Sequence, residues 1–235
     1  MEHSFTWYSL LHSFLPHPFS LLPEPSFTAL LVMVLLIALA YRFRRSLLGS
    51  DDPVIPEERL GVRNTMELLV ELVVGLSDNI IGKKGRKYVP LFGSLFIFIL
   101  TANFLGLVPG FSPPTSSFYS NLALGLVVFF AYHYFGVREH GVRYFKQFFG
   151  PVLFLAPLFI LIEVASHAFR PVSLSIRLFG NMFGDHMVLE IFTDLTKIGV
   201  PVLFYILGSL VSVIQAVVFT ILTIIYVAMA ISHEH

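Results

Sequence analysis

The chain has 235 residues, of which 56% are hydrophobic and only 13% are charged. Soluble domains carry about 25% charged residues, so this composition predicts an integral membrane protein. The formal net charge is zero, which gives no support to nucleic acid as a partner. The chain has no cysteine, which excludes disulfides, thiol nucleophiles and iron–sulfur ligation by its own side chains.

The first predicted span is the apolar run of residues 27–41. Residues 1–26, which precede it, lack the basic start and the small-residue cleavage site of a secretory signal, so we expect them to be retained. The run is short for a span of about 20 residues, and flanking residues must contribute. Arg42, Arg44 and Arg45 follow at once, and the positive-inside rule places them in the cytoplasm and the N-terminus outside.

Residues 60–81 predict an amphipathic helix. Their charged side chains share one helical face, and they are Arg63, Glu67, Glu71 and Asp78. This pattern is typical of a helix that lies on the cytoplasmic surface of the membrane. A helix packed between other helices is the alternative that the same pattern leaves open.

Two further spans are predicted over residues 88–109 and 118–137, joined by an uncharged turn. Basic clusters lie at the other end of each span, and they comprise Lys83, Lys84, Arg86 and Lys87 before the first and Arg138, Arg143 and Lys146 after the second. The positive-inside rule places both clusters in the cytoplasm and the turn outside. The arginines that follow the span of residues 27–41 agree with this topology. The same topology puts the C-terminus in the cytoplasm.

The last two apolar segments, residues 151–194 and 201–232, are too long for upright spans. At about 1.5 Å per residue they would run about 66 Å and about 45 Å, whereas the hydrocarbon core is about 30 Å thick. We therefore expect two long, tilted helices that form a hairpin, the first kinked near Pro171. The expected fold is a single all-α membrane domain over residues 1–235, with about five membrane-embedded helices and one amphipathic surface helix.

Arg177 lies in an apolar stretch of the first hairpin segment. Its side chain stays charged because its pKa exceeds about 12, and placing it at membrane depth costs about 2.5–3.5 kcal/mol. We therefore expect a polar cavity or a charged partner beside it. At about 100° per residue, further polar side chains share its helical face, and they are Glu163, Ser166, Arg170, Ser173 and Asn181.

A second polar stripe follows on the opposite face of the same segment, formed by His186, Glu190 and Thr193, with Asp185 between the two stripes. The topology puts the first stripe in the cytoplasmic half of the membrane and the second in the outer half. Two offset, water-accessible half-channels that meet near one arginine would need this arrangement. For Ser166 and Ser173, hydrogen bonding between helices is the simpler alternative.

Gln215 is the strongly polar residue at mid-depth in the last segment. We expect it to face Arg177 across the hairpin, which would satisfy its amide. Gly208 on the same helix either permits close helix approach or leaves room for the imidazole of His186.

Residues 177–182, Arg-Leu-Phe-Gly-Asn-Met, resemble the signature around the essential arginine of subunit a of the F-type rotary ATP synthase. Residues 214–219 (Ile-Gln-Ala-Val-Val-Phe) and 222–226 (Leu-Thr-Ile-Ile-Tyr) resemble the last helix of this family. Residues 101–109 (Thr-Ala-Asn-Phe-Leu-Gly-Leu-Val-Pro) resemble an earlier helix. The resemblance covers nearly the whole chain.

The resemblance implies that Arg177 faces the carboxylates of a rotating ring of small hairpin c subunits. It also implies peripheral-stalk b subunits as partners, a bacterial inner membrane, and protons or sodium ions as the transported species. Neither a cofactor nor a metal is expected. The residues that it assigns are Asn103, His186 and Gln215 to the outer half-channel, Glu163, Ser166 and Tyr226 to the cytoplasmic one, and Asn181 to the side of the arginine.

The chain departs from the family pattern at one point. Some members hold a carboxylate at the position of His186 and a histidine at the position of Gly208. Here the second position has no side chain, so a proton relay there is excluded. The neighbouring Asp185 is a candidate for the missing carboxylate.

Other classes of function remain open. A self-contained ion channel or secondary transporter could use Arg177 as an anion site, and a structural scaffold would leave the arginine and both stripes unexplained. The sequence has no Gly-rich phosphate loop, nucleophile elbow or zinc motif, so we expect an ion-translocating subunit without catalytic chemistry of its own. The end of the chain, residues 232–235, is expected to be a frayed polar tail.

Overall fold

The structure is a computed structural model that describes residues 7–12, 23–48, 61–141, 144, 156–196 and 199–232. These residues form helices joined by turns, with no strand among them. The α-helices are α1 (Trp7–His12), α3 (Glu24–Leu48), α4 (Val62–Ile80), α5 (Val89–Gly106), α6 (Phe118–His140), α7 (Ala156–Leu195) and α8 (Val200–Ile231), and the 3-10 helices are η1 (Lys83–Tyr88) and η2 (Pro114–Ser116).

Five helical segments in this part of the chain are long and apolar enough to cross a membrane. They overlap the five spans expected from the sequence, so the all-α membrane fold is confirmed. Several expectations concern residues outside the described ranges. These are most of the N-terminal segment, the basic residues Arg143 and Lys146, the start of the hairpin at 151–155, and the tail after residue 232.

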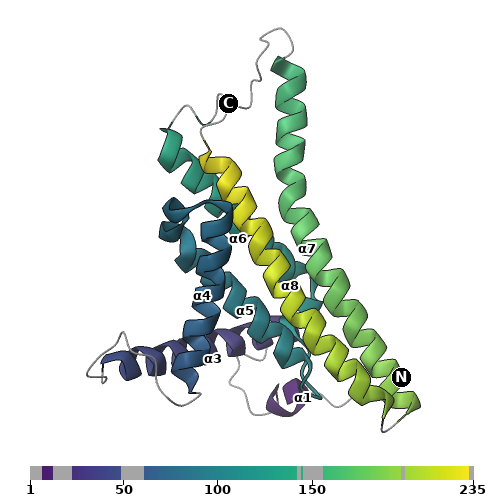
Figure 1. The fold of residues 1–235 in the computed structure, drawn as a ribbon. Coiled ribbons are helices and arrows are strands. Elements are labelled where there is room, and N and C mark those ends of the chain that lie inside the picture. Colours follow the sequence, from purple (N-terminus) through teal and green to yellow (C-terminus); the bar gives the residue numbers. More distant parts are fainter. Residues whose placement is uncertain are drawn as a thin grey trace.

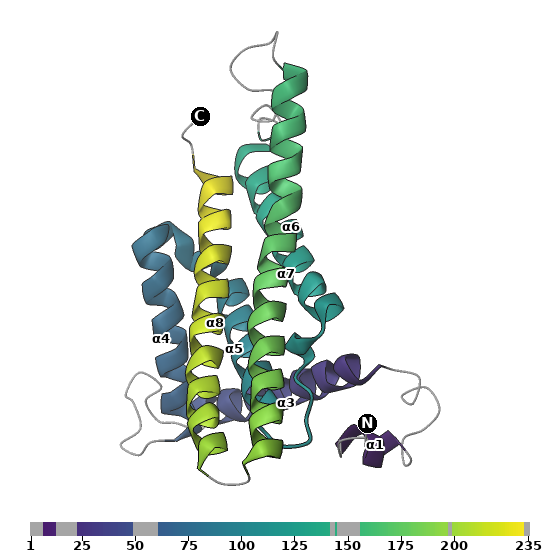
Figure 2. The same cartoon turned by 90° about the vertical axis from the view of Figure 1, so that its right-hand side faces the viewer.

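Helix α3 has 25 residues and is longer than the expected run of 27–41. It continues through Arg42, Arg44 and Arg45, because arginine favours helix and its apolar stem can lie along the membrane while its charge reaches water. The length that the apolar run lacked is therefore supplied by the basic residues after it. Figures 1 and 2 show that α3 crosses the direction of α7 and α8 at a steep angle.

Helix α4 runs roughly along α8 and packs against α5 and α8. Arg63 is 3% exposed and donates from Nε to Oε1 of Glu67 at 2.9 Å. The first residue of the charged face therefore lies on the packed side of α4. Leu68 and Leu72 are exposed on the other side. Because α4 runs roughly along α8, it also crosses the direction of α3 at a steep angle. An upright α3 would therefore leave α4 along the membrane plane. Placement on the membrane surface stays a prediction.

The core lies between α5, α6 and α8, where large aromatic side chains such as Phe96, Tyr132 and Phe219 are buried. Helix α6 approaches α7 closely at Gly125. A Cβ atom at that position would lie 2.7 Å from the backbone oxygen of Pro171 and 2.7 Å from Oγ of Ser175. A glycine is therefore required for the two helices to cross at this distance.

Helices α7 and α8 have 40 and 32 residues and lie side by side as a hairpin. Pro171 is inside α7, and the helix axis changes direction in this region without a break in the helix (Figure 1). The turn before α8 contains Gly199 at φ +93°, a conformation that glycine adopts without strain. The boundaries agree with the expected hairpin within a few residues. At about 60 Å, α7 fits the membrane only when strongly tilted.

Candidate functional site

The first polar stripe lies on the outer surface of α7. An adjoining side of the helix packs inward through the apolar side chains of Leu174, Leu178 and Met182. The predicted stripe residues are half-buried or exposed, and they are Glu163, Ser166, Arg170, Ser173, Arg177 and Asn181. All six side chains are thus at least partly exposed, and their grouping into one polar stripe stays a prediction.

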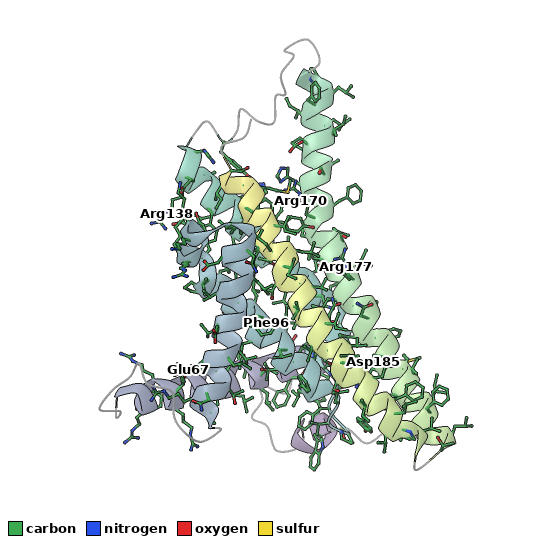
Figure 3. All side chains as sticks on the ribbon, viewed as in Figure 1. Glu67, Phe96, Arg138, Arg170, Arg177 and Asp185 are labelled. Carbon is green, nitrogen blue, oxygen red and sulfur yellow. The ribbon has the colours of Figure 1, made fainter. Side chains whose placement is uncertain are left out.

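Arg177 is exposed at the middle of this stripe. Figure 3 shows Arg170, Arg177 and Asp185 in succession along α7, beside α8. No carboxylate among the described residues lies within ion-pair distance of Arg177. The guanidinium therefore presents its charge to whatever covers this face of the hairpin.

Gln215 is buried in α8, and its amide oxygen accepts a hydrogen bond from Nδ2 of Asn181 at 2.7 Å. The expectation that Gln215 is satisfied by Arg177 is wrong in its partner, because the bond goes to Asn181, one helical turn further along α7. The Nε2 atom of Gln215 is buried and has no hydrogen-bond partner in the described part of the chain.

Glu163 belongs to a hydrogen-bonded series of side chains that the sequence pattern did not predict. His167 lies one turn after it, and its Nε2 atom is 3.2 Å from Oε1 of Glu163. The other ring nitrogen, Nδ1, is 2.8 Å from the hydroxyl oxygen of Tyr132 on α6. The i, i+4 spacing of Glu163 and His167 is a signal that could have identified the pair, whereas Tyr132 required the structure.

Arg170 lies over two tyrosine rings from neighbouring helices. Its guanidinium carbon is 5.8 Å from the ring centroid of Tyr132 and 5.4 Å from that of Tyr226. Both distances are within the range of cation–π attraction. The structure therefore brings Tyr226, a predicted pathway residue of α8, to the same end of the hairpin as Glu163. Ser166 lies nearby on α7 and is exposed.

Between the two stripes, Asp185 occupies the space beside Gly208. A Cβ atom at Gly208 would lie 2.6 Å from Oδ2 of Asp185. The side chain that uses the space left by this glycine is therefore Asp185, and the alternative in which His186 fills it is wrong. His186 is half-buried, and its Nε2 atom is buried with no partner in the described ranges. Glu190 is exposed further along the helix.

Asn103, expected beside the outer half-channel, is completely buried. Its Oδ1 atom accepts a hydrogen bond from Oγ1 of Thr115 at 2.8 Å, and its Nδ2 atom donates to the backbone oxygen of Ser212 at 3.4 Å. Asn121 donates in turn to the backbone oxygen of Thr115 at 2.6 Å. Asn103 therefore ties the loop between α5 and α6 to α8, one turn from Gly208, and forms part of the wall at this end of the hairpin.

Comparison with known proteins identifies close relatives. Residues 26–228 match the family described as ATP synthase A chain. ATP synthase subunit a of Bdellovibrio bacteriovorus is 47% identical over 193 residues, which cover 82% of this chain and 84% of that protein. ATP synthase subunit a 1 of Syntrophotalea carbinolica is 44% identical over 207 residues, which cover 88% and 85%. The matched family region contains both polar stripes of α7 and the whole hydrogen-bonded chain from Tyr132 to Glu163.

Proposed function

Because the chain belongs to the ATP synthase subunit a family, we propose that it is the proton-translocating stator subunit of an ATP synthase. Two offset half-channels on the α7–α8 hairpin deliver protons to and from the carboxylates of a rotating ring of c subunits. Rotation of that ring couples the ion gradient to ATP synthesis. The catalytic chemistry belongs to other subunits of the complex.

The observation that carries this proposal is the exposed charge of Arg177 on a helix that is long and apolar enough to cross a membrane. An arginine at membrane depth without a partner costs about 2.5–3.5 kcal/mol. A carboxylate on a neighbouring subunit offsets this cost and accounts for the exposure of the side chain. A ring of c subunits that each carry one membrane carboxylate supplies such a partner repeatedly as it turns.

The proposed mechanism follows from the fixed charge. A rotor carboxylate that arrives protonated loses its proton near Arg177, because the guanidinium favours the ionised form. The ionised carboxylate is then confined to the polar interface until it is protonated again, since a charge facing lipid is costly. Arg177 also repels protons and keeps the half-channels separate. Each charge that crosses gains about 2.3 kcal/mol per 100 mV of membrane potential.

The two half-channels are assigned to the two ends of the hairpin. The cytoplasmic one uses Glu163, Ser166 and Tyr226, and the outer one uses Asn103, Asp185, His186, Glu190 and Gln215, with Asn181 beside the arginine. The buried and unpartnered nitrogens of His186 and Gln215 support the outer assignment, because buried polar atoms call for water or a ligand. The fit of Asp185 against Gly208 supports it as the carboxylate of this half.

The remaining parts of the proposal concern location and neighbours. The chain spans the plasma membrane of a bacterium, with the N-terminus outside and the C-terminus in the cytoplasm, as the basic clusters predict. Peripheral-stalk b subunits hold it against the turning ring. The apolar face of α3, on which Met33 and Ile37 are exposed, contacts lipid or one of these neighbours.

The test is the Arg177→Ala variant in the assembled ATP synthase. We expect ATP-driven proton pumping into membrane vesicles to be abolished, while the subunit is still incorporated into the complex. The matched control is Ser173→Ala, which changes an exposed polar residue one turn away on the same face and should pump normally. Coupled pumping by Arg177→Ala at the wild-type rate would disprove the proposal.

A second measurement separates this function from a self-contained transporter. The chain alone, reconstituted into liposomes, should show no substrate-specific flux, because its half-channels are connected only by a moving carboxylate. Selective anion flux that depends on Arg177 and needs no partner would favour the transporter instead.

A further inference from the structure

His167 connects Glu163 to a second helix and has no role in the mechanism above. The imidazole is 6% exposed, whereas the Glu163 side chain is 38% exposed. The ring therefore lies behind the carboxylate, on the side toward α6. Tyr132, the next member of the chain, is completely buried.

The partners of His167 define which ring nitrogen donates. A carboxylate without a proton can only accept, and toward such a carboxylate of Glu163 the Nε2–H of His167 donates to Oε1. Nδ1 then carries no hydrogen and accepts from the hydroxyl of Tyr132. One neutral tautomer thus satisfies both bonds, and the tyrosine keeps the imidazole in that tautomer and orientation.

The position of Tyr132 argues against a proton path through His167. A conducting chain must reach water at both ends, whereas Tyr132, on the α6 side of the imidazole, has no exposed surface. The Tyr132 ring is also engaged, since it lies beneath the guanidinium of Arg170. The remaining role for the imidazole is to hold Glu163.

We propose that His167, oriented by Tyr132, is a positioning residue that holds the Glu163 carboxylate in place on the cytoplasmic polar stripe. A hydrogen bond from a buried donor suits this task, because it fixes the direction of the acceptor. The inference rests on the proposed function, since it assigns a task to a residue behind the cytoplasmic half-channel.

Other polar groups surround the imidazole but do not replace its bond to Glu163. The His133 ring is 5.0 Å from the His167 ring, and its Nδ1 atom lies 2.9 Å from the backbone oxygen of Phe129 on its own helix. Arg170 lies over the rings of Tyr132 and Tyr226. Tyr144 packs against His133 at 5.8 Å between ring centroids.

Two substitutions of His167 separate its two hydrogen bonds. In His167→Gln, the amide nitrogen can reach the place of Nε2 and donate to Glu163. In His167→Asn, the shorter side chain reaches only the place of Nδ1, so it can contact Tyr132 but not Glu163. ATP-driven proton pumping in vesicles carrying the assembled ATP synthase should fall several-fold in His167→Asn and stay near the wild-type rate in His167→Gln.

Three further variants complete the experiment. Tyr132→Phe keeps the ring under Arg170 but removes the hydroxyl, and it should cause a smaller loss in the same direction. His133→Gln is the matched control within the same cluster and should pump normally. In a Glu163→Gln background, His167→Asn should cause no additional loss, because there is no longer a carboxylate to hold.

The outcomes that overturn the inference differ from those that overturn the function. Equal pumping rates for the Asn and Gln variants, or a full additional loss of rate in the Glu163→Gln background, contradict a positioning role. Normal pumping by Glu163→Gln contradicts it as well. None of these results changes the outcome expected for Arg177→Ala, and only that variant tests the proposed function. If His167→Asn fails to assemble, Tyr132→Phe still decides the question.

Discussion

In the amino-terminal half of α7, Glu163 and Arg170 are both held by side chains that come from outside the first stripe. In the carboxy-terminal half, Asp185 lies against the backbone of Gly208, and His186 has a buried ring nitrogen without a partner in the described residues. The same helix thus carries polar groups held by neighbouring side chains toward its start, and toward its end a buried imidazole nitrogen without a partner in the described residues.

This difference indicates which part of α7 depends on water or on a ligand for its hydrogen bonds. A satisfied network keeps its geometry without help, because each bond orients the next. Unsatisfied buried groups need water or a ligand, since leaving each unpaired costs about 1–3 kcal/mol. We therefore expect the amino-terminal half to be preorganised and the carboxy-terminal half to be hydrated in the working complex.

The largest expected effect on stability comes from Gly125→Ala, which breaks the packing behind the amino-terminal half. The new methyl group would lie 2.7 Å from the backbone oxygen of Pro171, so α6 and α7 must separate. We expect a loss of about 1–3 kcal/mol, measured as a lower thermal stability of the detergent-solubilised complex. The control is Gly93→Ala, where a Cβ meets no atom within 4 Å. Equal melting temperatures for the two variants would contradict the close crossing.

The next effect concerns the bond between the two hairpin helices. Asn181→Leu removes the donor that lies 2.7 Å from Gln215 and leaves a buried amide without any partner. The expected cost is about 1–3 kcal/mol, measured by the same thermal scan. Adding Gln215→Leu should recover most of that loss, because the orphaned amide is removed as well. A double variant that is less stable than Asn181→Leu would argue against this bond.

Gly208→Ala should affect activity more than stability. Its methyl group would lie 2.6 Å from a carboxylate oxygen of Asp185, which is the end of a movable side chain and can shift aside. We expect a nearly unchanged melting temperature but slower proton pumping, because the carboxylate is displaced from its place beside α8. Gly184→Ala, where a Cβ meets no atom within 4 Å, is the control. A normal pumping rate would contradict the assignment of Asp185 to the outer half-channel.

The smallest effect is expected away from both halves, at the ion pair of Asp78 and Arg86, whose shortest contact is 2.6 Å. The hydrogen bond from Arg86 lowers the pKa of Asp78 below 3.8. A lowered pKa in the folded state means that the stabilisation is present above the ordinary value and is lost as the pH falls through the lowered one. Asp78→Asn should therefore be slightly less stable than the wild type at neutral pH and equal to it in strong acid, as thermal scans across pH would measure.

Periodicity and hydropathy predicted the order and approximate bounds of the helices, because membrane spans need long apolar runs. They also placed Arg177 and its stripe, since these depend on one helix alone. What they could not predict were contacts that depend on how two helices cross. Examples are Tyr132 with His167, Asn181 with Gln215, and Asp185 with Gly208. In each case a rotation of one helix by a fraction of a turn would select another partner.

The uninterrupted helix of α7 has a further consequence. From Arg177 to Asp185 the helix contains neither a break nor a proline, so the angle between the two stripes is determined by the number of residues that separate them. Inserting one alanine between these positions would rotate everything after it by about 100° and advance it by about 1.5 Å. No joint in this part of the helix can absorb that rotation. The angle between the two stripes, which we propose as the entry and the exit of the ion, therefore depends on the number of residues between them and can be altered one residue at a time.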